Sequence, residues 1–192
     1  QTEKSELTVV EANPECAPYY AAMGPRCHLE RTSLESWIAN DKTGKNYDLI
    51  LCFDVLEHLR EPMQTMRSLI QGSLTSGGEI WATFPNAQSL SRKWLGSLWP
   101  QYKVEHLYYF SRASVKRLCD EAGLQILELR PNRKYLSIGY FLGVGANFGP
   151  RVTRVLFGFL ARTLPAFIQR IKVSLLIGEW LLVAKRSAHA QP

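Results

Sequence analysis

Three ionisable side chains follow directly on a short apolar run in the chain. Leu49–Phe53 is too short for a helix and is bounded by polar residues, which favours a buried strand. Asp54, Glu57 and His58 come immediately after this run. Ligands of open α/β sheets bind beside the carboxyl ends of the strands, so this order predicts a binding or catalytic site here.

Histidine is the side chain best suited to accept and release a proton near neutral pH. His58 is therefore the first candidate for a general base, and His106 is the second. The spacing of Asp54, Glu57 and His58 also allows them to converge on one side of a helical turn, where they and His106 would offer ligands to a divalent metal. A structural interpretation stays open for each group: a hydrogen-bonding histidine, or carboxylates that accept from loop N–H groups or cap a helix.

A fourth acidic residue ends another predicted strand. Glu11 follows Leu7–Val10, and its two carboxylate oxygens match the two adjacent hydroxyls of a ribose. The alternative is a solvated side chain, or a partner for the helix that Asn13 and Pro14 would begin.

Strands and helices alternate along the chain, which predicts an α/β fold with a mostly parallel sheet and helices on both faces. The predicted strands are Leu7–Val10, Arg26–Glu30, Asp48–Phe53, Ile80–Phe84, Leu124–Leu129 and Glu179–Lys185. Predicted helices begin at Pro14, Leu34, Pro62 and Ser111 or Ser114, and a longer one covers Arg151–Lys172, divided at Pro165.

The length of 192 residues suits a single domain over residues 1–192. The four cysteines show no Cys-x-x-Cys spacing, so we expect neither a zinc site nor disulfides. The sequence contains no signal peptide and no apolar run long enough to cross a bilayer. We therefore expect a cytoplasmic protein.

The net charge of +6 is concentrated in one segment. No acidic residue lies between Glu128 and Glu179, whereas that interval carries eight basic ones. The basic residues are Arg130, Arg133, Lys134, Arg151, Arg154, Arg162, Arg170 and Lys172. Within it, 151–172 has an apolar stripe at helical spacing, which is typical either of peripheral contact with the inner face of a membrane or of a cap packed on the domain with its arginines solvated.

The segment Tyr47–Leu59 resembles the fourth strand and following loop of class I S-adenosylmethionine-dependent methyltransferases. It is most similar to the branch that includes the ubiquinone-pathway O-methyltransferases. Three further segments resemble elements of that family in the same order. They are Thr8–Pro14, Gly77–Asn86 and Glu105–Ser111. The resemblance covers roughly residues 7 to 130 and resumes near Gly178.

The resemblance implies a Rossmann-like fold, S-adenosylmethionine as cofactor, and a role for each matching residue. Cofactor-binding positions would be Glu11, Ala12, Ser33, Leu34 and Phe53. Catalytic positions would be His58, His106, Asp54 and Glu57. Some relatives with a Glu-x-x-Glu-His pattern bind a divalent ion, but Asp54 replaces the first glutamate here, so we expect no metal and keep this set as an alternative ligand group.

The chain departs from the family in two places. The first strand and its glycine-rich turn would precede Leu7 and are missing, so we expect an N-terminally truncated chain, with a degenerate relative as the alternative. Glycines in that turn let the backbone approach the cofactor, so this chain alone is expected to bind it poorly and to be inactive. The hairpin before the last strand is expanded into a basic, apolar insert over residues 135–172.

The resemblance implies O-methylation of a small or lipid-linked acceptor. Methyl transfer is a displacement in which a hydroxyl acceptor must lose its proton, so a base or a metal ion is needed beside it. A non-catalytic remnant that serves as a binding or scaffold module is the alternative. We expect no nucleic-acid partner, because the basic segment is strongly apolar and Pro85-Asn86 is followed by Ala87-Gln88. The oligomeric state is left open.

Overall fold

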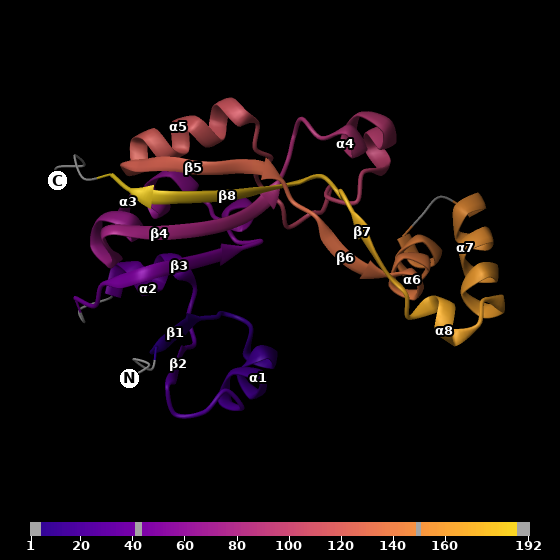
Figure 1. Cartoon of the computed structure of the whole chain (residues 1–192), viewed down its shortest axis with the longest axis horizontal. Helices are drawn as coiled ribbons and strands as arrows, with labels where there is room; N and C mark the ends of the chain where they lie inside the picture. Colours follow the sequence, from indigo (N-terminus) through magenta and orange to yellow (C-terminus); the bar gives the residue numbers. More distant parts are fainter. Residues whose placement is uncertain (1–4, 41–43, 149–150, 188–192) are drawn as a thin grey trace.

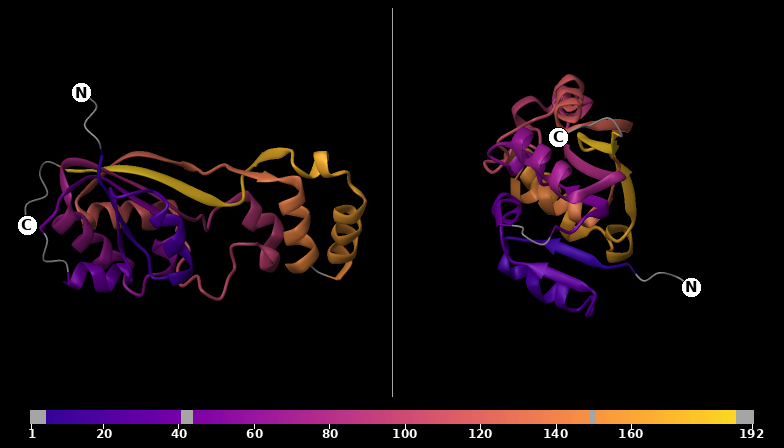
Figure 2. Two further views of the ribbon diagram at one scale, coloured as in Figure 1. Left: turned by 90° about the horizontal axis from the view of Figure 1, so that it is seen from below. Right: turned by 90° about the vertical axis from the view of Figure 1, so that its left-hand side faces the viewer.

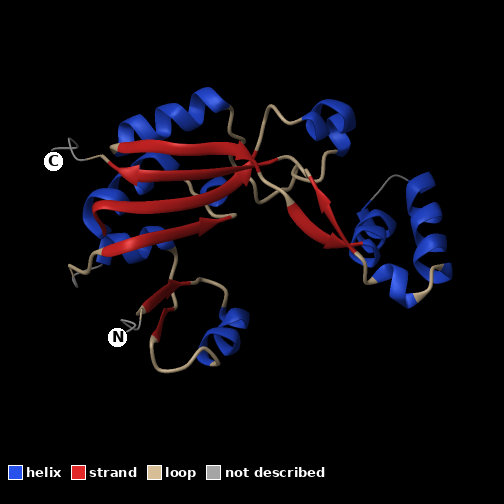
Figure 3. Cartoon of the chain, in the orientation of Figure 1, coloured by secondary structure: helices blue, strands red, loops and turns tan. Residues whose placement is uncertain are grey.

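The computed structural model describes residues 5–40, 44–148 and 151–187. Its strands form one four-stranded sheet and two separate two-stranded ladders (Figures 1 and 3). The strands are β1 (Leu7–Val10), β2 (Cys27–Glu30), β3 (Tyr47–Phe53), β4 (Leu74–Pro85), β5 (Leu124–Pro131), β6 (Lys134–Ser137), β7 (Lys172–Leu175) and β8 (Glu179–Arg186). The α-helices are α1 (Ala17–Ala21), α2 (Leu34–Asn40), α3 (Pro62–Ser73), α4 (Leu90–Leu95), α5 (Arg112–Ala122), α6 (Ile138–Phe148), α7 (Arg151–Thr163) and α8 (Ala166–Gln169).

The strand order of the large sheet is β3-β4-β8-β5. β3 and β4 are parallel, and β8 runs antiparallel to both of its neighbours, β4 and β5. β1 and β2 form a parallel pair of their own. The α/β class predicted from the alternation of strands and helices is confirmed.

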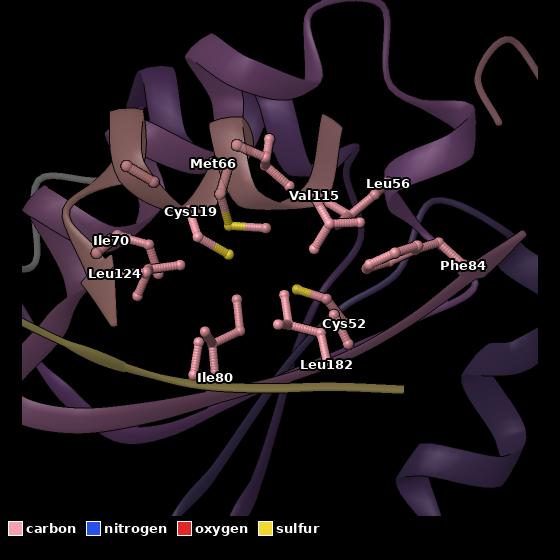
Figure 4. Packing of buried hydrophobic residues seen from close by; sticks show 14 of the residues in the cluster. Cys52, Leu56, Met66, Ile70, Ile80, Phe84, Val115, Cys119, Leu124 and Leu182 are labelled. Atoms are coloured by element: carbon pink, nitrogen blue, oxygen red, sulfur yellow. The ribbon is translucent and has the colours of Figure 1, made fainter. Parts of the chain in front are cut away.

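The hydrophobic core lies between this sheet and helices α3 and α5 (Figure 4). Each helix turns its apolar stripe onto the sheet, because residues three and four apart share one helical face. The fully buried contributors include Met66 and Ile70 from α3, Val115 and Cys119 from α5, and Ile80, Phe84 and Leu182 from the strands.

The helices of the described residues cover only one face of the four-stranded sheet, seen in Figure 2 (left). The expectation of helices on both faces is therefore met on one face alone. On the other face, Leu49, Leu51 and Trp81 remain exposed, because successive side chains of a strand point to opposite sides of the sheet.

The β1–β2 pair lies beside the β3 edge of the large sheet (Figure 1). No strand of the described residues pairs with both β1 and β3, and β3 is an edge strand of its sheet. The expectation about a missing first strand stays a prediction.

Three elements differ from the sequence prediction. β4 begins at Leu74 rather than Ile80, because an irregular stretch that includes Gly77 at φ 78° joins the end of α3 to the regular ladder. The β6–β7 ladder and helix α6 were not predicted. The sequence of α6 is apolar on all sides and rich in glycine, so it shows neither the period of a helix nor that of a strand. The two strands of the ladder have only four residues each, too few for a clear alternation.

We call residues 134–175 the arm; it comprises β6, α6, α7, α8 and β7 and extends away from the large sheet (Figure 1). The predicted division at Pro165 is confirmed, since α7 ends at Thr163 and α8 begins at Ala166. Inside the arm, α6 packs on α7, with the rings of Phe141 and Phe157 5.7 Å apart. A Cβ atom at Gly145 would collide with Phe157, so this crossing requires glycine.

Candidate active site

Asp54 occupies the first position after β3, where its backbone takes the left-handed conformation (φ 54°). Its N–H donates to the Thr83 carbonyl at 3.0 Å, and the Thr83 hydroxyl donates to its Oδ1 at 3.1 Å. The Lys134 ammonium lies 3.0 Å from its Oδ2. Strained backbone held by several contacts is typical of functional sites, and here both carboxylate oxygens are already engaged.

Glu57 and His58 lie in a short 3-10 helix (Leu56–His58) beyond Asp54, and His106 reaches them from a distant loop. The N–H of Leu107 donates to the Glu57 carbonyl at 2.8 Å and fixes that loop against the helix. Ligand atoms of Glu57, His58 and His106 all lie within 4.8 Å of one another. The structure therefore brings three of the four predicted groups together, and Asp54 is not one of them.

His58 is exposed, and its ring is oriented by the backbone. Its Nδ1 lies 3.0 Å from the Glu105 carbonyl oxygen, which can only accept, so Nδ1 carries the proton. The lone pair of Nε2 is then available to accept a proton. The His106 ring packs edge-on against His58, with centroids 4.8 Å apart.

Glu57 and His106 are both buried and neither is fully satisfied. Among the described residues, Glu57 Oε2 and His106 Nδ1 have no hydrogen-bond partner. Glu57 Oε1 lies 4.0 Å from His106 Nε2, too far for a hydrogen bond. Buried polar atoms are normally paired, so an unpaired buried atom on each of these two residues makes Glu57 and His106 candidate functional residues.

The surroundings also shift the protonation of this pair. Burial raises the pKa of Glu57 to about 7, and the negative charges of Asp54 and Glu179 act in the same direction. Burial lowers the pKa of His106, with Lys103 and His58 adding to the effect. Near neutral pH Glu57 can therefore hold or release a proton with little cost, and His106 stays neutral; perturbed pKa values of this kind are typical of functional sites.

A second polar cluster joins this edge of the sheet to the arm. Glu179, at the start of β8, is buried and receives hydrogen bonds from Gln101 Nε2 at 2.7 Å and Asn132 Nδ2 at 3.1 Å. Lys134 Nζ lies 2.6 Å from Glu179 and 3.0 Å from Asp54, so it bridges the two carboxylates. Burial opposes its charge, but these two carboxylates outweigh burial and raise the pKa of Lys134.

Sequence reasoning missed Lys134. It stands 80 residues from Asp54, and no local motif marks it. The only signal was indirect: Lys134 lies within the interval from Glu128 to Glu179 that contains no acidic residue, so any carboxylate partner had to come from outside that interval.

The predicted cofactor residues Glu11, Ser33 and Phe53 lie at or just beyond the carboxyl ends of β1, β2 and β3. A carboxylate, a hydroxyl and a half-exposed aromatic ring fit a nucleoside in chemistry. Glu11 Oε1 accepts from the Asn13 N–H at 2.7 Å, and Ser33 Oγ accepts from the Ser36 N–H at 3.1 Å, so each also supports the start of a helical segment.

The two remaining cofactor candidates differ in their surroundings: Ala12 is exposed, whereas Leu34 packs against the core. Two surface pockets, one beside α5 and one on the arm, include none of these residues and neither Glu11 nor His58.

Solved structures share this fold at low sequence identity. The YcgJ protein from Bacillus subtilis superimposes with a TM-score of 0.60 at 12% identity, covering 95% of this chain and 82% of that one. A SAM-dependent methyltransferase from Archaeoglobus fulgidus gives 0.53 at 12%, covering 93% and 75%. The [4+2]-cyclase SpnF gives 0.53 at 15%, covering 95% and 66%. The fold alone is therefore compatible with more than one reaction.

No curated protein sequence matches the chain. Residues 3–129, which include β1 to β4, α5 and most of β5, match the family described as "Methyltransferase domain". This range contains all of the predicted site residues. The chain belongs to the methyltransferase domain family, as a class I methyltransferase that uses S-adenosylmethionine.

Proposed function

We propose that the chain transfers a methyl group from S-adenosylmethionine to a hydroxyl oxygen of a small or lipid-linked acceptor. The observation that carries this is the cluster of Glu57, His58 and His106, with two orphaned buried atoms, directly beyond the carboxyl end of β3. The similarity of Tyr47–Leu59 to the ubiquinone-pathway branch supports an oxygen acceptor.

The cofactor supplies an electrophilic methyl group when bound. His58 Nε2 accepts the proton of the acceptor hydroxyl, because its Nδ1–H is held by the Glu105 carbonyl. His106 packs edge-on against the His58 ring and helps to orient it, Glu57 lies beside the two rings, and Glu11 holds the ribose hydroxyls.

A weaker alternative is that the same cluster binds a metal ion that assists the reaction. An ion would take Glu57, His58 and His106, since Lys134 and Thr83 already engage Asp54. Ligand atoms around one tetrahedral Zn-like ion lie roughly 3.3–3.6 Å apart, given metal–ligand distances of about 2.0–2.2 Å. The observed spread of 4.8 Å would have to contract.

The test uses a protein in which the predicted first strand and glycine-rich turn precede this chain. It measures methyl transfer from radiolabelled S-adenosylmethionine to a panel of phenols, catechols and prenylated phenols. We expect His58→Gln to lower kcat by about 10²–10⁴-fold, with cofactor affinity unchanged in calorimetry. His28→Gln is the matched control, since His28 is exposed on β2 outside the cluster. Unchanged turnover of His58→Gln would remove His58 from catalysis, and loss of activity in EDTA would favour the metal.

The second candidate function is a non-catalytic binding module of the methyltransferase fold. This candidate is supported by the hydrogen bond that the Asn13 N–H donates to Glu11, because it gives the Glu11 carboxylate a structural role in the free chain. Glu11→Gln should weaken cofactor binding roughly 10–100-fold if Glu11 holds the ribose, whereas Glu15→Gln, also exposed nearby, should not. A wild-type protein that carries the predicted glycine-rich turn, yet shows neither S-adenosylmethionine binding in calorimetry nor turnover, would support this candidate.

A further inference from the structure

The outer side of α7 carries an apolar stripe that nothing covers within the described residues. Val152, Val155, Leu156 and Phe159 are 81%, 75%, 52% and 63% exposed. They are three and four residues apart and therefore lie on one side of the helix. Phe157 points elsewhere and packs on α6. A contiguous exposed apolar surface of this kind marks an interaction site.

Basic side chains flank the stripe. Arg151 is one helical turn from Val155, and Arg162 is one turn from Phe159. Both arginines are exposed, and among the described residues neither forms an ion pair. No acidic residue occurs in the whole arm. The surface therefore presents apolar groups edged by positive charge.

The following short helix continues this pattern. Phe167 is 70% exposed and Ile171 is 49% exposed, next to the exposed Arg170 and Lys172. Arg170 and Lys172 also line a pocket on the arm together with Tyr140. Cationic groups beside a hollow suit the phosphate of a lipid headgroup.

We propose that the arm docks on the surface of a bilayer that contains anionic lipids, with α7 lying in the interface. The apolar stripe would enter the boundary of the acyl chains, and the arginines would contact the headgroups. None of the described helices is long and apolar enough to cross a bilayer, which agrees with a helix that lies on the surface. A second copy of the chain is a poorer occupant, because it would bring two basic surfaces together.

The inference does not depend on the proposed reaction. If both hold, the arm keeps the enzyme at the surface where a lipid-linked hydroxyl is presented. The membrane-docking proposal and the proposed reaction can be refuted separately, because docking is measured without cofactor or substrate.

The test is vesicle flotation of the full chain with phosphatidylcholine alone and with added phosphatidylglycerol. We expect the wild-type chain to float with the anionic vesicles and to be released by high salt. Val155→Asp/Phe159→Asp should abolish flotation. Arg151→Gln/Arg162→Gln should weaken it roughly fivefold per charge removed.

Val104→Asp is the matched control, because Val104 is fully exposed on a loop outside the arm. It should float like the wild-type chain, and near-ultraviolet circular dichroism should be the same for all variants. The proposal is overturned if the wild-type chain does not float, or if Val155→Asp/Phe159→Asp floats as well as it. It is also overturned if that variant only converts a dimer to a monomer in sedimentation.

Discussion

Helices α5 and α7 are both amphipathic, but the apolar side of α5 is buried whereas the apolar side of α7 is exposed. In α5, Val115 and Leu118 are 0% and 1% exposed, packed against the sheet and α3. In α7, Val152 and Val155 are 81% and 75% exposed. The same hydrophobic period therefore specifies a helix and its apolar side, but it does not specify the partner that covers that side.

The largest expected contrast is in the cost of truncating these two helices. Leu118→Ala should lower the free energy of unfolding by about 2–5 kcal/mol, because it leaves a cavity in a packed core. Phe159→Ala should change it by less than about 0.5 kcal/mol, because the ring is already in solvent. Urea denaturation of both variants measures the two costs.

Equal costs for these two variants would contradict the contrast, since they would mean that α7 is as well packed as α5. Phe157→Ala serves as an internal control within the arm. Its ring packs on α6, so its cost should fall between the other two.

Glu57 is buried in the short helix after β3 although, among the described residues, one of its carboxylate oxygens has no hydrogen-bond partner. This burial should make the free energy of unfolding depend on pH. The carboxyl titrates at 4.5 in the unfolded chain and at about 7 in the folded one. Between these values the folded state keeps a proton that the unfolded state releases. The free energy of unfolding should therefore fall as the pH rises from 4.5 to 7, by about 3 kcal/mol, and level off above.

The measurement is the difference in unfolding free energy between the wild-type chain and Glu57→Gln across pH 4–8. The difference is needed because His106, whose pKa is lowered, acts in the opposite direction and loses stability as the pH falls. Glu61→Gln, on an exposed neighbour, should show no such slope. A flat difference curve for Glu57→Gln would mean that Glu57 is solvated in the folded chain.

Lys134 belongs to the arm but pairs with Asp54 and Glu179 at the edge of the large sheet. A substitution of Lys134 therefore tests how much this contact between the arm and the sheet contributes to stability. Lys134→Met should lower the free energy of unfolding by about 1.5–3 kcal/mol, because the buried Glu179 carboxylate loses a charged donor at 2.6 Å. Arg133→Met, at the neighbouring exposed position, is the control. Adding Glu179→Gln to Lys134→Met should recover part of the loss, and a strictly additive double variant would argue against a direct pair.

The features that the sequence predicted correctly are those that depend on residues close together in the chain. Val115, Leu118, Cys119 and Ala122 recur at helical spacing, which predicts that they face inward on one helix. All four are buried, because a local period determines that face. Glu57 and His58 were placed correctly beyond a strand because they directly follow its short apolar run in the sequence. Site roles for these residues stay predictions.

What the sequence did not predict depends on contacts between distant segments. Asp54 was grouped with Glu57, but Lys134 from the arm engages it instead. Helix α6 has apolar residues on both sides, so no period marked it, and it forms because α7 covers part of it. A local sequence pattern cannot predict a contact between residues that are 80 positions apart, such as Lys134 and Asp54.

The smallest expected effect concerns the exposed charges of the same two helices. On α5, Lys116 pairs with Asp120 one turn later at 2.6 Å, whereas no acidic residue exists on α7 to pair with Arg154. Lys116→Ala should cost about 0.3–0.5 kcal/mol at low salt and less at high salt, because exposed pairs are screened. Arg154→Ala should cost nothing or slightly stabilise the chain, since it relieves repulsion among like charges. If Arg154→Ala were the more destabilising variant, Arg154 would have a partner within the chain, and the positive surface of α7 would not be free for an external one.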